Sequence, residues 1–268
     1  MAIPIKSPRD IDAIRRSGRQ LWSILDDAVR EARAGMTTGA IDARICAAIR
    51  NAGAEPVLLG GRRGDGPPFP ACCSITVNEE VVHGVPGARI LRAGDVVTID
   101  AALRLDGWCA DAARATVIGV APDASTAGLV RAAREALDAA IGAMTPGVAW
   151  SVAARAAARA ARAAGVRLVS AYAGHGIGRR LHEPPEACFL GPGSGRGWAS
   201  GQDFILRPGM VLAVEPIVTE GLGGGSSDPE LIGTDDGWTV LARDRSRACH
   251  EERTVAVTRG GPVVLTAP

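Results

Sequence analysis

Five residues spread along the chain combine four carboxylates with one imidazole, and each lies in or beside a run typical of a β-strand. They are Asp100, Asp111, His175, Glu215 and Glu252. A ligand set rich in oxygen with a single nitrogen suits divalent Mn, Fe or Co better than a structural zinc, which favours thiolates. Two such ions about 3.5–4 Å apart can clamp and activate a water molecule. The five residues therefore predict a dinuclear hydrolytic centre.

Two of these acids interrupt apolar runs, where a charge is costly. Asp100 follows the run 96–99, and Glu215 follows the run 210–214. A carboxylate in a buried strand is unfavourable unless it is paired or bound to a metal. Asp111 comes eleven residues after Asp100, beyond a turn at Gly107, so the two strands of a hairpin would bring both carboxylates together. Ordinary turn and edge aspartates stay open as the alternative for this pair alone.

The other two ligand candidates have less specific surroundings. Glu252 directly precedes the β-run 254–257, and its neighbour Glu251 points to the other face, so we expect one of the two to be exposed. His175 is flanked by glycines, which let the backbone approach closely and free the imidazole. These glycines lack the GxGxxG spacing of a phosphate loop. A lone histidine of this kind is commonly structural. His175 is a candidate metal ligand because the four acids accompany it.

The remaining histidines have either a structural or a substrate-binding interpretation. His83 precedes a glycine, and His182 follows His175 by seven residues. Each could be a satisfied surface or core histidine, or an uncharged donor that binds a substrate carbonyl beside the metals. His250 is interpreted as a loop residue.

Composition excludes several classes of protein. The chain has 268 residues, enough for one large domain or two fused halves, and its net charge is +1. The chain therefore lacks the large positive net charge that is typical of proteins that bind nucleic acid. No apolar run of about 18 residues indicates a membrane span. Residues 1–12 lack the apolar segment of a signal peptide, so we expect a cytoplasmic protein.

Six cysteines, at positions 46, 72, 73, 109, 188 and 249, form no CxxC pair and no zinc-finger spacing. In a reducing cytosol we expect buried or reduced thiols. A disulfide between the adjacent positions 72 and 73 is improbable.

The helices that must frame the site are indicated by apolar periodicity. Ser7 is a good N-cap for a helix that begins with Pro8 and has a periodic segment over 11–32. Further helices are predicted at 38–51, 123–143 and 148–164. The last carries arginines at 155, 159 and 162, for which a solvated face is favoured over RNA binding.

Strands are predicted at 72–77, 95–101, 115–120, 211–218, 239–242 and 254–258, with a short apolar run reaching residue 83. Glycine-rich loops are expected at 60–70, 191–201 and 221–233. Two helices followed by antiparallel strands thus occur twice. This order predicts an α+β fold of two pseudo-symmetric halves, and the absence of a linker predicts one domain over 1–268.

Over nearly its whole length the sequence resembles the type I methionine aminopeptidases, peptidases of the pita-bread fold. The resemblance is carried by segments IKSPRDIDAIRRSGR, SITVNEEVVHGVP, GDVVTIDAALRLDGWCAD, AGHGIGRRLHEPP, LRPGMVLAVEPIV, DGWTV and EERTVAVT. It implies hydrolytic removal of the N-terminal methionine from nascent proteins with a small second residue. The implied partners are nascent polypeptides and the ribosome, and the implied state is a monomer.

The resemblance also implies roles for the five ligand candidates. Asp111 and Glu252 would bridge two divalent ions (Co, Mn or Fe), and Asp100 would hold one ion through both oxygens. His175 and Glu215 would hold the other. Glu215 would also accept a proton from the bridging water.

On the substrate side, the resemblance implies that His83 and His182 hold the scissile peptide and stabilise the tetrahedral intermediate. Phe69, Leu181 and Trp238 would line the methionine pocket.

The chain departs from the family pattern at several positions. Ala112 and Ala113 replace Thr-Ser, Leu181 replaces an aromatic residue and Ser74 replaces a cysteine. Glu251 replaces an aromatic residue, and the stretch 191–201 is an insertion.

Two other functions compete with this interpretation. An Xaa-Pro aminopeptidase or dipeptidase shares the fold, although such proteins commonly carry an additional N-terminal domain. An inactive pita-bread binding module is the other alternative, but such proteins typically lose ligand residues.

Overall fold

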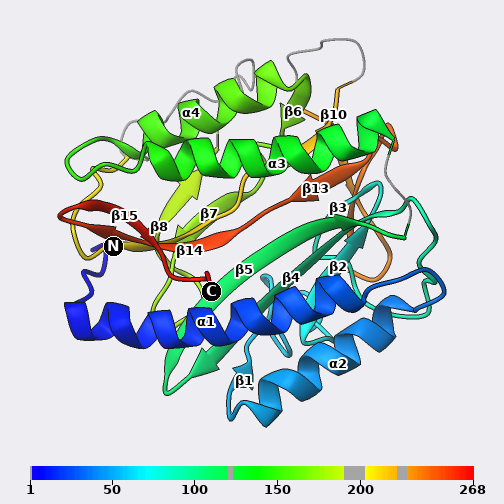
Figure 1. Ribbon diagram of the computed structural model, residues 1–268, viewed down its shortest axis with the longest axis horizontal. Helices are drawn as coiled ribbons and strands as arrows, with labels where there is room; N and C mark the ends of the chain where they lie inside the picture. Colours follow the sequence, from blue (N-terminus) through cyan, green and yellow to red (C-terminus); the bar gives the residue numbers. More distant parts are fainter. Residues whose placement is uncertain (1, 120–122, 190–202, 222–227) are drawn as a thin grey trace.

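The computed structural model describes residues 2–119, 123–189, 203–221 and 228–268. Helices α1 and α2 lie on one side of the view in Figure 1 and α3 and α4 on the other, with the strands between and behind them. The helices are α1 (Pro8–Glu31), α2 (Thr38–Asn51), α3 (Ala124–Gly142) and α4 (Trp150–Ala163). The strands are β1 (Glu55–Pro56), β2 (Cys73–Val77), β3 (Glu80–Val82), β4 (Val96–Leu105), β5 (Trp108–Val117), β6 (Val166–Leu168), β7 (Ala173–Gly176), β8 (Glu183–Cys188), β9 (Val211–Val214), β10 (Ile217–Glu220), β11 (Leu231–Gly233), β12 (Val240–Ala242), β13 (Ala248–His250), β14 (Arg253–Thr258) and β15 (Gly261–Val264).

Helix α1 begins where its capping residues require. The Ser7 hydroxyl accepts the N–H of Asp10, whose carboxylate accepts the N–H of Ser7, and Pro8 occupies the first turn. The apolar stripe of α1 packs on β4 and β5. It includes the buried residues Ile14, Leu21 and Leu25.

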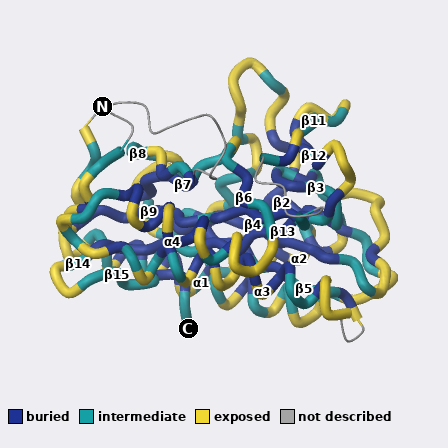
Figure 2. Tube along the Cα trace, turned by 90° about the horizontal axis from the view of Figure 1, so that it is seen from above, coloured by how far each residue is buried: buried dark blue, intermediate teal, exposed yellow. Residues whose placement is uncertain are grey.

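Two antiparallel sheets carry the candidate ligands. In one sheet the strand order is β1-β4-β2, with β5 paired to β4. The other has the order β15-β14-β9-β7-β8. Helices α3 and α4 pack together through alanines, among them Ala133, Ala136, Ala153 and Ala157, all essentially buried. Small side chains let two helices approach closely. Most of β4 and all of β9 are buried and appear in dark blue in Figure 2.

The predicted α+β architecture, with two helices followed by antiparallel strands in each half, is confirmed. All four helices were predicted to within a few residues. The arginines of α4 are exposed, as expected of a solvated face. No helix of the described residues is both long and apolar enough to cross a membrane.

Several strand predictions were wrong in detail. The strand predicted at 115–120 is the end of β5, which starts at Trp108 and ends at Val117. The strand predicted at 211–218 is divided into β9 and β10 at Glu215 and Pro216. Proline has no N–H for a ladder, which explains the interruption. Strand β11 ends the loop predicted at 221–233, whereas the predicted loop 191–201 lies outside the described residues.

The prediction that the cysteines are reduced thiols was wrong for one pair. Cys46 of α2 and Cys72 form a disulfide with a Cα–Cα distance of 5.4 Å. The N–H groups of Cys72 and Cys73 both donate to Asp42 Oδ1, which fixes this segment against α2. Because the two cysteines are 26 residues apart, their spacing gave no signal. Cysteines 73, 109, 188 and 249 are thiols.

We expect the close approach of β7 to β9 to make Gly174 indispensable. A Cβ at Gly174 would lie 2.3 Å from the carbonyl oxygen of Ala213, whereas a Cβ at Gly87 would meet nothing within 4 Å. Gly174→Ala should lower the free energy of unfolding by about 1–3 kcal/mol or more. The matched variant Gly87→Ala should change it by less than about 0.5 kcal/mol. Urea denaturation of both variants tests this, and equal stabilities would contradict it.

Candidate metal centre

The β4–β5 hairpin places Asp100 and Asp111 on one face. Its two-residue turn consists of Asp106 and Gly107, both with positive φ, which suits a tight hairpin. In the register, Asp111 lies opposite Ala102, two residues from Asp100. Residues opposite each other, and residues two apart on one strand, share a face. The eleven-residue spacing therefore turns both carboxylates to the same side.

Strands β7, β9 and β14 bring in the other three candidates. His175 pairs with Ala213 of β9, so Glu215, two residues further, is turned to the same face. Arg253 pairs with Val214, and one more step along this register places Glu252 opposite Glu215. Glu252 also forms an isolated bridge with Ala113 of β5. The main chain at Glu252 is thus where the two sheets meet.

Three of the five side chains form a tight group. One ligand atom each from Asp111, His175 and Glu252 lies within 4.8 Å of the others. His175 Nε2 is 3.5 Å from Asp111 Oδ2 and 3.9 Å from Glu215 Oε1. Asp100 lies beside this group, and its charge contributes to raising the pKa values of Asp111 and Glu252.

Burial makes this concentration of acids electrostatically unfavourable. Desolvation raises the pKa of Glu215 to about 8 and raises the pKa values of Asp111 and Glu252 above their ordinary range. Burial pushes the pKa of His175 down, but Asp111 and Glu215 outweigh it and raise that pKa to about 9. The group therefore favours a positive charge at its centre.

The donor atoms fit a divalent cation. Asp111 Oδ1 and Glu252 Oε1 are buried, and neither has a hydrogen-bond partner among the described residues. A buried carboxylate oxygen without a partner costs free energy, which a bound cation would offset. Oxygen ligands with one imidazole suit a first-row divalent ion.

A buried threonine that the sequence did not reveal connects the two sheets behind the ligands. Thr254 Oγ1 donates to the carbonyl of Asp111 at 2.8 Å and accepts its N–H at 3.0 Å. Its alternation with Glu252 along β14 is the signal that could have revealed it.

His250 was predicted to be a loop residue, which is wrong. It lies in β13 with 1% of its surface exposed, and its Nε2 is 3.7 Å from Asp100 Oδ2. Burial lowers the pKa of His250, but Asp100 outweighs it, so that pKa is raised. The segment around His250 has too short an apolar run to be recognised as a strand.

The expectation that either Glu251 or Glu252 is exposed was also wrong. The two residues are 1% and 2% exposed. The side chains of Glu251 and Glu252 point to opposite faces of the strand, as expected, but both faces are buried at this point. Glu251 is paired with Arg134, a residue from α3 that is 117 positions away in sequence.

Aromatic residues surround His83 beside the acids. Phe69 and Trp238 meet edge to face with ring centroids 5.1 Å apart, and the His83 ring lies 6.0 Å from Trp238. Tyr172, which the sequence interpretation did not include, contacts His83 at 5.5 Å. Burial lowers the pKa of His83 to about 4, so this imidazole is neutral at pH 7.

His182 lies against the metal ligand candidates, with its ring centroid 4.3 Å from that of His175. Burial lowers its pKa to about 4 as well. Leu181, predicted to line the same pocket as Phe69 and Trp238, is partly buried against a different cluster, which contains Ile14 and Ile177.

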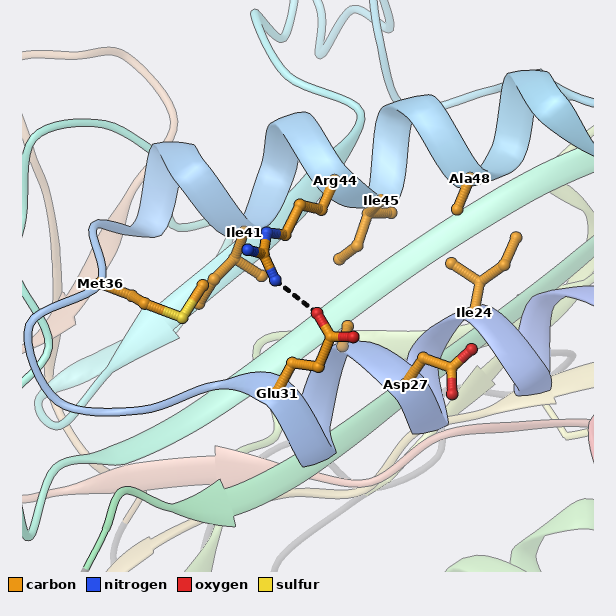
Figure 3. A pocket seen from close by; sticks show the side chains of 9 residues that line it. Ile24, Asp27, Glu31, Met36, Ile41, Arg44, Ile45 and Ala48 are labelled. Atoms are coloured by element: carbon orange, nitrogen blue, oxygen red, sulfur yellow. Dashed lines mark hydrogen bonds and ion pairs between the residues drawn. The ribbon is translucent and has the colours of Figure 1, made fainter.

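A separate groove of about 340 Å³ lies between α1 and α2. Figure 3 shows its apolar floor and the ion pair of Glu31 with Arg44 across it. The volume would hold a small ligand. However, none of the metal-ligand or substrate-binding candidates lines it, so the acidic group is the better candidate for the functional site.

Comparison with known proteins shows the family to which the chain belongs. The model of metallopeptidase family M24 matches residues 12–259. Methionine aminopeptidase 1 of Mycobacterium tuberculosis is 40% identical over 98% of this chain and 95% of its own. The crystal structure of methionine aminopeptidase from Rickettsia prowazekii superposes with a TM-score of 0.88 at 28% identity, covering 99% of this chain and 100% of that one.

Proteins with lower sequence identity share this fold. Prolidase from Pyrococcus furiosus has a TM-score of 0.73 at 19% identity, covering 98% of this chain and 65% of that one, which shows the pita-bread fold alone. The chain belongs to metallopeptidase family M24, among its methionine aminopeptidases, and is a metal-dependent aminopeptidase. The resemblance found in the sequence is thereby confirmed.

We expect the buried imidazole of His83 to make the fold sensitive to acid. Its pKa is about 4 in the folded protein against an ordinary value of 6.5. Between these values the unfolded chain binds more protons, so stability falls as the pH drops through this window. The free energy of unfolding, measured by urea at about pH 7 and about pH 5, should fall less in His83→Gln than in the wild type.

Tyr172→Phe is the matched control for this experiment, because it alters the ring in contact with His83 and leaves the imidazole in place. It should show the acid sensitivity of the wild type. A His83→Gln variant that loses as much stability as the wild type would contradict the prediction.

Proposed function

We propose that the chain removes N-terminal methionine from nascent polypeptides with a small second residue, by hydrolysis at two divalent metal ions. The observation that carries this proposal is the buried group of Asp111, His175 and Glu252, with two carboxylate oxygens that have no hydrogen-bond partner in the described part of the chain. The methionine aminopeptidases among its relatives support the choice of substrate.

Five residues would hold the ions. They are Asp111 and Glu252, where the two sheets meet, together with Asp100, His175 and Glu215. Bound ions would supply Lewis acidity and lower the pKa of a water molecule. Co, Mn and Fe all suit this donor set.

Glu215 would accept the proton that the attacking water loses. Burial raises its pKa, and bound cations would lower it again, which would leave an ionised carboxylate that can accept a proton. Glu215 belongs to the acidic group, since its Oε1 lies 3.9 Å from His175 Nε2 and the register of β9 and β14 brings it near Glu252.

His83 and His182 would bind the scissile peptide as neutral donors. Burial keeps the pKa of each near 4, so each imidazole carries one N–H and no charge at pH 7. A neutral donor can stabilise developing negative charge on a carbonyl oxygen without repelling a neighbouring cation. His83 also contacts Trp238, which with Phe69 would receive the methionine side chain, whereas Leu181, the third candidate, packs against the cluster of Ile14 and Ile177.

We also propose a domain organisation, an oligomeric state and a location for the enzyme. Residues 1–268 would form one catalytic domain, since the two sheets that carry the ligand candidates meet at Glu252. The enzyme would act as a cytoplasmic monomer on chains that emerge from the ribosome.

A peptide assay separates this function from that of the prolidases with the same fold. With Mn²⁺ or Co²⁺ added, Met-Ala-Ser should be cleaved to Met and Ala-Ser, whereas Xaa-Pro peptides whose first residue is not methionine should be cleaved at least about 100-fold more slowly, because the proposed pocket would fit methionine. Liberated amino acids are measured by chromatography. A preference for Xaa-Pro would overturn the proposal, and inactivity on both with normal folding would favour a binding module.

Loss of the bridging carboxylate should abolish hydrolysis. Glu252→Ala removes one of the bridges, so we expect kcat to fall at least about 1,000-fold and the bound metal to decrease. The exposed acid Glu230, paired with Arg243 at the surface, supplies the control variant Glu230→Ala with unchanged activity. Activity assays and elemental analysis of both variants test this. Near-normal turnover of Glu252→Ala with intact metal content would overturn the assignment.

A further inference from the structure

The residues on either side of Glu252 anchor it to β5, the strand that carries Asp111. The N–H of Glu252 donates to the carbonyl of Ala113 at 3.0 Å, which is the isolated main-chain bridge at this point. A single bridge holds a strand end weakly. Side chains from Glu251 and Arg253 extend the connection on both sides.

Glu251 forms the first of these connections. Its Oε1 accepts the N–H of Ala115 at 3.3 Å and the Nε–H of Arg134 at 2.9 Å. Arg134 also donates to the Ala115 carbonyl at 3.2 Å. The side chain of Glu251 is only 2% exposed, so its charge requires these partners.

Arg253 forms the second connection, and it acts directly on Glu252. Its Nη1 donates to the Glu252 carbonyl at 2.8 Å, lies 3.5 Å from the Ala113 carbonyl and is 3.6 Å from Glu251 Oε2. One guanidinium thus contacts both sides of the bridge between β14 and β5.

Trp22 of α1 holds that guanidinium in place. The Cζ of Arg253 lies 3.9 Å from the centroid of the indole ring, and the Cζ of Arg114 lies 4.6 Å from it. Arg114 is in turn paired with Asp26 on α1. A guanidinium stacked on an aromatic ring has few orientations, so its hydrogen bonds are well directed.

We propose that Arg253 is a positioning residue that fixes the backbone of Glu252 on β5 and so sets the distance between the carboxylates of Glu252 and Asp111. This inference rests on the metal site of the proposed function. Its consequence is a higher affinity of the site for divalent ions, because the two bridging carboxylates are held in place before the ion binds.

Three possible roles of Arg253 predict different changes in metal affinity. If its positive charge acted alone, removing it would strengthen binding of a divalent cation, since like charges repel. If it only stabilised the fold, the melting temperature would fall while the affinity stayed unchanged. If it positions Glu252, the affinity should fall although a repelling charge has been removed.

Calorimetric titration of the metal-free full-length protein with Mn²⁺ distinguishes these roles. For Arg253→Leu we expect binding of the tightest ion to weaken about 10–100-fold, as for other residues that orient metal ligands. Arg253→Lys keeps the charge but cannot stack and reach both carbonyls as a guanidinium does, so its affinity should fall as well. Affinity equal to or higher than that of the wild type in Arg253→Leu would overturn the proposal.

The matched control is Arg247→Leu, which breaks another partly buried ion pair. Arg247 Nε donates to Glu220 Oε1 at 2.9 Å, and the contacts of this pair include none of the five ligand candidates. Its melting temperature should fall with unchanged Mn²⁺ affinity, and an equal loss of affinity would overturn the positioning role. If Arg253→Leu does not fold, Arg253→Lys decides: wild-type affinity overturns the proposal, and weakened binding supports it.

Hydrolysis of Met-Ala-Ser by the wild type, measured in parallel, separates this inference from the proposed function. A wild-type protein that binds Mn²⁺ but leaves the peptide intact overturns the function, while weakened binding by Arg253→Leu still supports the positioning role. A wild-type protein that cleaves the peptide, with unchanged affinity in Arg253→Leu, overturns the positioning role alone. A wild-type protein that binds no Mn²⁺ overturns both.

Discussion

The burial of several carboxylates in one place is the constraint on which the rest of the structure depends. Asp111, Glu215 and Glu252 lose their hydration together, and desolvation is the largest cause of the raised pKa of each. One imidazole, that of His175, cannot neutralise them all. Such a group is tolerable only if a cation or protons share it, because an uncompensated buried charge is very costly. The need for a cation or protons to offset the buried charge therefore explains both which donors are present and why they lie together.

The rest of the fold fixes these acids where they would otherwise move apart. The register of the β4–β5 hairpin turns Asp100 and Asp111 to one face, and that of β9 and β14 places Glu215 opposite Glu252. Main-chain ladders are stiff, so the separation of the carboxylates is set by pairing rather than by flexible side chains. Where the two sheets meet, a single main-chain bridge joins them among the described residues, and the side chains of Thr254, Glu251 and Arg253 add hydrogen bonds beside it.

The sequence predicted two of the ligand candidates because each breaks a local rule. An aspartate after the run 96–99 and a glutamate within 210–218 contradict strand propensity, and such conflicts are typical of functional sites. The helices were predicted because their caps and periodicity are local. The burial of Glu251, the strand position of His250 and the Cys46–Cys72 disulfide depend on partners distant in sequence, which no local pattern contains.

Ala112 and Ala113, which stand where the family pattern has Thr-Ser, leave the connection between β5 and Glu252 intact. Ala112 is buried in the core beneath α1 and α2, whereas Ala113 lies opposite Asp100 and its carbonyl accepts the N–H of Glu252. A main-chain acceptor does not depend on the side chain at position 113, so this connection needs no hydroxyl there. Side-chain contacts from Arg253 and Glu251, outside the β4–β5 hairpin, add to the connection between β5 and the strand end that carries Glu252.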